Sequence, residues 1–370
     1  MATSEQSSGR IDFLDGVRAV TASYVVAHHI WEIVYPDGNP HGLVGHLTFG
    51  LHFGNFGVAV FIVVSGYSLM LGPARNGSRL RDGVPDFIRR RFLRIVLPFW
   101  IALAISALIG LTLLREPSGS LWDNAIPVTW PKFLSNLLLL QDVIEVHSIN
   151  YVFWSIALEW HIYFAFPLLL WAFRRASPPV VASTALLVTS VVGFVFTDGP
   201  ELLSYFSFFG CFAVGAWAAK ASHDIRRGPA DSRWGRYATP GAGLLLLASV
   251  LIALTTRSYQ LADPVLGAAV ACALVAMSTG RLRAARRVLA SRPLVWLGAS
   301  SYSLYLLHAP VIHALFVHVF ARLGLLTYDP LSLVVLLPVG LVAAILLTRV
   351  FYHVAEVPFI PKKKVVAQAP

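Results

Sequence analysis

The sequence predicts an all-α polytopic membrane protein with about ten transmembrane helices and both termini in the cytosol. The first observation behind this fold class is composition: of 370 residues, 56% are hydrophobic and 13% are charged, and the mean hydropathy is +0.68. Soluble globular domains usually contain about a quarter charged residues. The second observation is a series of apolar runs, each long enough to cross roughly 30 Å of hydrocarbon as a helix. The third is an uneven distribution of Lys and Arg between the connections.

In chain order, the apolar runs predict spans at about 17–35, 50–71, 94–114, 151–173, 179–197, 203–220, 239–256, 262–280, 298–321 and 331–353. They form one integral-membrane domain, 1–370, in which the polar ends 1–10 and 361–370 are expected to be disordered tails. The longest outer connection, 115–150, contains several Pro and Trp residues. Because Trp favours the headgroup level, we expect an interfacial or re-entrant element there.

The distribution of positive charge sets the predicted topology. With a cytosolic N-terminus, 23 Lys and Arg residues fall in cytosolic segments, 4 in outer segments and 2 within spans. Such an excess of cations marks the cytosolic side of a membrane protein. The net charge of +10 is therefore explained by topology and gives no reason to expect a nucleic acid partner.

The first span does not have the pattern of a cleaved signal peptide. Its leading region holds one cation, and the polar letters AHHIWE stand where small residues would precede a cleavage site. We therefore expect this span to be retained. Cys211 and Cys272 both fall within predicted spans and match neither a metal motif nor a disulfide scaffold, so they are expected to be packing residues.

Ionisable residues inside spans are candidates for function, because each costs about 2.5–3.5 kcal/mol or more at the bilayer centre. Arg18 and His29 are eleven residues apart, which places them on one helix face about 16 Å apart along the axis. Asp15 lies on the same face and is positioned to pair with Arg18. His28 points about 100° away from His29. The other candidates within spans are Glu159, His161, His308, His313, Arg349 and His353.

Glu159 lies at a depth that matches His29 to within about one helical turn, when each is counted from the outer end of its span. A histidine and a carboxylate at one depth predict a general base and its orienting partner, suited to activating a hydroxyl. The competing interpretation is a buried polar residue that only packs. We favour packing for His161, His313 and His353, and both interpretations stay open for His28.

Five stretches, in order and over nearly the whole chain, resemble the acyltransferase-3 family of integral-membrane O-acyltransferases. They are FLDGVRAVTASYVVAHHIW, GNFGVAVFIVVSGYSLML, FIRRRFLRIVLPFW, YVFWSIALEWHIYFAFPLLL and SYSLYLLHAPVI with the later AEVPF. The residues at the motif positions are Arg18, His29, Ser65, Gly66, Tyr67, Glu159, Tyr302, His308 and Glu356. This chain departs from the family pattern at Trp160, where a second polar residue often follows the glutamate.

The resemblance implies transfer of an acyl group, with acetyl or another short acyl expected, from cytosolic acyl-CoA to an acceptor hydroxyl. In this scheme His29 is the general base, Arg18 positions the donor, and Glu159 orients His29. The arginines before the third span suit the donor's phosphates, because a guanidinium presents paired hydrogen-bond donors. Positive-inside topology alone is an equal explanation for them. The predicted donor-binding residues are Arg89, Arg90, Arg91, Arg94, Ser65, Tyr302 and His308, with Arg90 and Arg94 favoured among the arginines.

Hydroxyls of Ser65 or Tyr302 are candidates to stabilise the developing oxyanion. No metal and no permanently bound cofactor are expected. The implied acceptors are a surface glycan, a glycolipid, or a glycosylated natural product such as a polyketide glycoside. Many family members carry an appended hydrolase-like domain, and without one this chain would recognise its acceptor through the membrane domain. The expected location is the cytoplasmic membrane of a bacterium.

Two other classes stay open on sequence grounds. A transporter of an acyl donor or acylated glycan would use the intramembrane His and Arg as a relay, but no internal repeat symmetry supports it. A non-catalytic sensor or scaffold would retain the fold without the chemistry. Transfer of a labelled acyl group separates the enzyme from both classes, because neither forms an ester.

Overall fold

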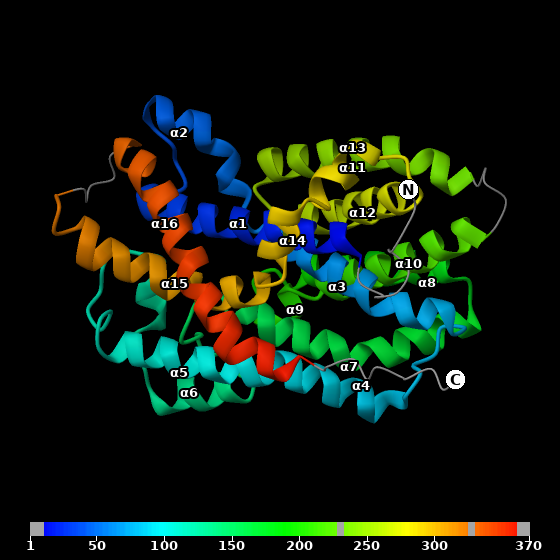
Figure 1. The fold of residues 1–370 in the computed structure, drawn as a ribbon, viewed down its shortest axis with the longest axis horizontal. Coiled ribbons are helices and arrows are strands. Elements are labelled where there is room, and N and C mark those ends of the chain that lie inside the picture. Colours follow the sequence, from blue (N-terminus) through cyan, green and yellow to red (C-terminus); the bar gives the residue numbers. More distant parts are fainter. Residues whose placement is uncertain (1–10, 228–232, 325–329, 361–370) are drawn as a thin grey trace, which may run out of the picture.

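The computed structural model describes residues 11–227, 233–324 and 330–360, and within them every regular element is helical. The predicted tails 1–10 and 361–370 lie outside the described residues. The α-helices are α1 (Asp12–Val34), α2 (Gly42–Thr48), α3 (Phe56–Arg75), α4 (Gly83–Arg91), α5 (Leu97–Leu111), α6 (Trp130–Leu137), α7 (Trp154–Arg175), α8 (Pro178–Val195), α9 (Glu201–Ser204), α10 (Ser207–Arg227), α11 (Arg233–Thr256), α12 (Tyr259–Ser278), α13 (Arg283–Leu289), α14 (Arg292–Gly298), α15 (Ser301–Leu315) and α16 (Pro330–Phe351). Most long helices run along the long axis of the molecule (Figure 1).

The all-α prediction is confirmed, and a long helix occupies each predicted span. Within the described residues, eight stretches are long and apolar enough to cross a membrane: Gly42–Arg75, Gly83–Leu111, Trp154–Arg175, Pro178–Val195, Arg236–Thr256, Tyr259–Ser278, Ser301–Phe320 and Ser332–Phe359. The other two predicted spans correspond to α1 and α10, which have 23 and 21 residues but carry more polar groups. Most residues of both helices are buried within the protein. This is expected for helices with polar residues, because polar side chains inside a membrane face protein and not lipid.

The connection 115–150 contains a short helix, α6, flanked by turns. Large apolar side chains are exposed on this helix and directly after it: Trp130 is 76% exposed, Leu134 50% and Leu138 62%. An apolar surface of this kind, with Trp at one end, suits the membrane interface. The position of this segment at the membrane interface stays a prediction.

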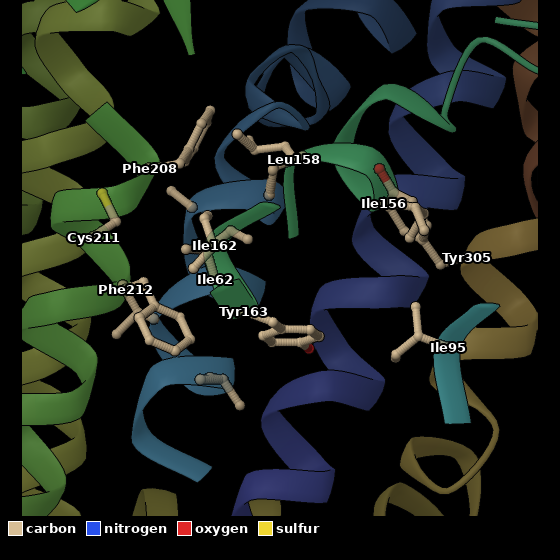
Figure 2. Packing of buried hydrophobic residues seen from close by; sticks show 14 of the residues in the cluster. Ile62, Ile95, Ile156, Leu158, Ile162, Tyr163, Phe208, Cys211, Phe212 and Tyr305 are labelled. Carbon is tan, nitrogen blue, oxygen red and sulfur yellow. The ribbon is translucent and has the colours of Figure 1, made fainter. Parts of the chain in front are cut away.

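Helices α3 and α10 pack closely against each other where they cross. A Cβ added to Gly66 would lie 2.2 Å from the carbonyl oxygen of Phe212, and one added to Gly215 would lie 2.2 Å from that of Val63. Only glycine therefore allows the two backbones to approach this closely. Apolar side chains fill the space around the crossing, among them the free thiol of Cys211, as Figure 2 shows. The predicted packing role is thus confirmed for Cys211.

Gly66→Ala is expected to destabilise the protein by about 1–3 kcal/mol, because the new methyl group overlaps the backbone of α10. Gly72→Ala, in the same helix, is the matched control, since a Cβ there has no heavy atom within 4 Å. The control is expected to be neutral or slightly stabilising, by about 0.5–1 kcal/mol. Thermal unfolding in detergent measures both, and equal midpoints would contradict the close crossing.

Three π-helical turns occur in the described residues, at Phe92–Val96, Phe316–Phe320 and Tyr352–Glu356. In the first and the last, a proline follows the turn by two residues, at Pro98 and Pro358. Because proline has no amide hydrogen, the carbonyl four residues before it has no α-helical donor, which favours local widening. Widened turns often occur at functional sites. The first and the last turn both contribute side chains to the cavity described below.

Candidate active site

A cavity of about 490 Å³ lies between α1, α3, α7, α15 and the π-helical turns Phe92–Val96 and Tyr352–Glu356. Six residues predicted from the sequence line it: Arg18, Ser65, Arg91, Arg94, Glu159 and Tyr302. Glu356 of the closing motif also lines it, and its Oε2 accepts a hydrogen bond of 2.6 Å from Ser303. The tertiary structure thus gathers residues that are almost 340 positions apart in the sequence.

Arg18 is fixed at the cavity wall by two side chains. Its Nη1 donates to Asp15 Oδ1 at 3.1 Å, and its Nη2 donates to Ser68 Oγ at 2.6 Å. The predicted pairing with Asp15 is confirmed. The i,i+3 spacing on α1 allows this pair, while Ser68 of α3 aims the guanidinium. The group is therefore held in one orientation before any ligand binds.

Arg94 and Arg91 lie at the same cavity but are held differently. Within the described part of the chain, Arg94 makes no hydrogen bond or ion pair, and the buried Nε of Arg91 has no hydrogen-bond acceptor. Arg94 belongs to the π-helical turn, whose Ile95 carbonyl accepts a 2.9 Å hydrogen bond from the hydroxyl of Tyr302. The two guanidinium groups therefore have donors available for an anionic ligand.

Arg89 and Arg90 do not reach this cavity. Both belong to α4, where Arg89 is exposed and Arg90 forms a 2.9 Å ion pair with Asp82. The helix places adjacent arginines on different sides, since successive residues are about 100° apart. Of the four predicted arginines, the structure thus brings Arg91 and Arg94 to the cavity and leaves the others outside.

Glu159 forms a compact hydrogen-bonded group with two hydroxyls. Its Oε1 accepts from Ser65 at 2.8 Å and also from Tyr163, and these two hydroxyls are 3.1 Å apart. The hydrogen of Ser65 is thus committed to Glu159, and that of Tyr302 to a backbone carbonyl. Neither hydroxyl is a free donor for an oxyanion in this conformation.

His29 is paired with a carboxylate that the sequence argument did not consider. Its Nδ1 lies 2.8 Å from Glu32 Oε2, and no hydrogen bond or ion pair joins His29 to Glu159 among the described residues. The predicted pairing of His29 with Glu159 is therefore wrong. Depth along a span fixes height in the membrane but not direction, and Glu159 points to α3. The missed signal was the i,i+3 spacing of His29 and Glu32 on one helix.

The Glu32 carboxylate determines the tautomer of His29. An ionised carboxylate accepts a hydrogen from Nδ1, so the neutral ring keeps its lone pair on Nε2. His28 lies on the other side of this carboxylate, with its Nε2 3.2 Å from Glu32 Oε2 and its Nδ1 2.8 Å from the carbonyl oxygen of Leu51. Through Nδ1, His28 donates to the Leu51 carbonyl oxygen and so holds the loop, and its Nε2 makes no hydrogen bond to Glu32. The neutral His29 ring presents a proton-accepting nitrogen.

His308 and Tyr151 enclose the ring of His29. The His308 ring stacks on it at 5.2 Å and the Tyr151 ring meets it edge-on at 5.0 Å. His308 Nδ1 faces the carbonyl oxygens of Leu304 and Tyr305, at 3.1 and 2.8 Å, and so it donates to them. His308 is thus a neighbour of His29 and does not line the cavity.

Tyr305 connects the wall of the cavity with the surroundings of His29. Ser155 and Tyr305 both line the cavity, and their hydroxyl oxygens are 2.6 Å apart. On its other side, the Tyr305 ring contacts His308 at 5.7 Å between centroids. The rings of Tyr305 and His308 thus lie in series between the arginine-lined cavity and His29.

Fold and site together define a helical membrane protein with an arginine-lined cavity near a partly buried histidine–carboxylate pair. The family model for the acyltransferase-3 family, described as an acyltransferase domain, matches residues 11–353. The chain belongs to this family.

Two curated relatives are similar over part of their lengths. Acyltransferase MdmB from Streptomyces mycarofaciens is 30% identical over 166 residues, which are 43% of this chain and 39% of that protein. YrhL from Bacillus subtilis (strain 168), which carries the name of a peptidoglycan O-acetyltransferase, is 26% identical over 333 residues, 81% of this chain and 48% of that protein. The chain thus spans less than half the length of each relative. No solved structure matches it.

Proposed function

We propose that the chain is an O-acyltransferase that moves a short acyl group, with acetyl expected, from acyl-CoA to a hydroxyl of a carbohydrate or glycosylated acceptor. Membership of the acyltransferase-3 family supports the reaction class. The observation that carries the proposal is the His29–Glu32 pair beside a cavity with unpaired arginines. The acetyl group and the glycan are supported by the name of the Bacillus relative.

The His29–Glu32 pair is suited to general-base catalysis. Nε2 of His29 would take the proton of the acceptor hydroxyl as its oxygen attacks the thioester carbonyl. Collapse of the tetrahedral adduct forms the ester and breaks the carbon–sulfur bond. The leaving thiolate then recovers the proton from Nε2, so that coenzyme A departs as the thiol. Glu32 stabilises the charged imidazolium between these steps, as a carboxylate does in a catalytic triad.

The cavity is suited to the donor. Coenzyme A carries phosphates, and the guanidinium groups of Arg91 and Arg94 have N–H donors available for them in the cavity. The guanidinium of Arg18 is already held in place by its hydrogen bond to Ser68. For the thioester to meet His29, its pantetheine arm must pass Tyr305 and His308, whose rings lie between the cavity and His29.

The proposal is tested with the full chain purified in detergent, incubated with labelled acetyl-CoA and sugar acceptors. Formation of a labelled ester supports it, and a transporter or sensor would form none. Mass spectrometry of cell extracts with and without the gene then identifies the acceptor as the species whose acyl-sized mass shift depends on the gene. Absence of both the ester and any gene-dependent shift would overturn the proposal.

Arg94→Ala is expected to raise the KM for acyl-CoA about 10- to 100-fold with a smaller change in kcat, because a charge-assisted hydrogen bond contributes about 1.5–3 kcal/mol. Arg89→Ala is the matched control, since Arg89 lies outside the cavity on the preceding helix. Steady-state kinetics with varied acyl-CoA distinguishes them. Equal increases in KM for both variants would indicate only the general positive charge of this region.

A further inference from the structure

A second hollow lies apart from the donor cavity, between α4 with its preceding turn and the last turns of α7. It has a volume of about 540 Å³. The two helices lie side by side in the lower part of Figure 1. None of the residues that line this groove lines the cavity at Arg18.

Positive charge dominates the groove. Arg79, Arg174 and Arg175 line it, and none of its described lining residues is acidic. Nη1 of Arg174 donates to the carbonyl oxygen of Ser78 at 2.8 Å, which fixes the guanidinium and leaves its other N–H groups available. Arg175 lies over the ring of Trp171, with 5.5 Å between Cζ and the ring centroid. Arg174 and Arg175 are thus held beside the groove by these contacts, and the positive charge of the groove favours an anion.

The remaining walls are apolar and partly open. Trp171 is 52% exposed and Val84 45%, whereas Leu170 is buried at the base. The groove lies at the end of a candidate membrane span, Trp154–Arg175, where Trp and Arg both favour the headgroup level. Apolar walls beside fixed arginines suit a ligand that carries both a phosphate and a hydrocarbon chain.

We propose that this groove binds one anionic phospholipid. Arg174 and Arg175, with Arg79, hold the headgroup phosphate, and one acyl chain lies along Leu170 and Trp171. A guanidinium binds phosphate through paired N–H donors, and anionic lipids attract clustered arginines at the membrane surface. Because the groove shares no residue with the donor cavity, the inference does not rest on the proposed function.

Native mass spectrometry of the full chain in detergent tests the site, with phosphatidylglycerol and the zwitterionic phosphatidylcholine as probes. Wild type is expected to retain one phosphatidylglycerol in preference to phosphatidylcholine. Arg174→Ala/Arg175→Ala is expected to weaken that binding about fivefold per arginine, which corresponds to about 1 kcal/mol each. Arg226→Ala/Arg227→Ala, an exposed arginine pair at the end of α10, is the matched control and should keep it.

Val84→Asp provides a second variant that is expected to fold, because this side chain is largely exposed. A negative charge at the groove should repel the headgroup and weaken phosphatidylglycerol binding. Equal losses in the two double-arginine variants, no preference between headgroups, or displacement of the bound lipid by excess coenzyme A would each overturn the proposal. The last outcome would assign the groove to the donor instead.

Discussion

Replacing His29 by alanine is expected to lower the rate of acyl transfer about 10²–10⁴-fold, because the acceptor hydroxyl loses its general base. The KM for acyl-CoA should change little, since His29 does not line the donor cavity. Initial rates with labelled acetyl-CoA in detergent measure this effect. The ring is partly enclosed by Tyr151 and His308, so unfolding midpoints should be recorded alongside the rates.

His28→Asn is the matched control for this prediction. His28 is the neighbouring histidine, and it is hydrogen-bonded through Nδ1 to the carbonyl oxygen of Leu51, which an asparagine amide can also reach as a donor. We expect this variant to keep most of its activity. A folded His29→Ala protein with the full rate of transfer would remove His29 from the mechanism, and a larger loss in His28→Asn would transfer the role of base to His28.

The second large effect is expected at Glu32. Glu32→Gln should lower kcat by about 10²–10⁴-fold with little change in structure, because the amide no longer requires a hydrogen on Nδ1 and allows the tautomer that blocks Nε2. Glu32→Asp, which keeps the charge but shortens the side chain, should retain more activity than Glu32→Gln. The dependence of kcat on pH should also change in Glu32→Gln, since the carboxylate no longer stabilises the imidazolium.

Glu159→Gln distinguishes the two acids. Glu159 is hydrogen-bonded to Ser65 and Tyr163 at the cavity wall, so its loss should alter donor binding more than turnover. If Glu159→Gln lowers kcat and Glu32→Gln leaves it unchanged, then Glu159 is the partner of His29 in the reacting conformation.

The sequence by itself determined the helical class, the positions of the long helices and the residues worth testing. An apolar run of about 20 residues forms a helix in lipid, because the backbone N–H and C=O groups find no water there and must form hydrogen bonds within the same helix. The cost of ionisable groups at this depth singled out Arg18, His29 and Glu159. Local spacing was also sufficient for the Arg18–Asp15 pair, whose members lie three residues apart on one helix.

Only the tertiary structure decided which polar residues meet. The rotation of each helix about its axis is set by packing, such as the close crossing at Gly66 and Gly215, and this rotation turns Glu159 toward Ser65. The same packing brings Arg91 and Arg94 to the cavity and leaves Arg89 outside it. A single sequence gives the height of each residue in a span, but the direction in which a side chain points depends on the neighbouring helices, and that direction pairs Glu159 with Ser65 and not with His29.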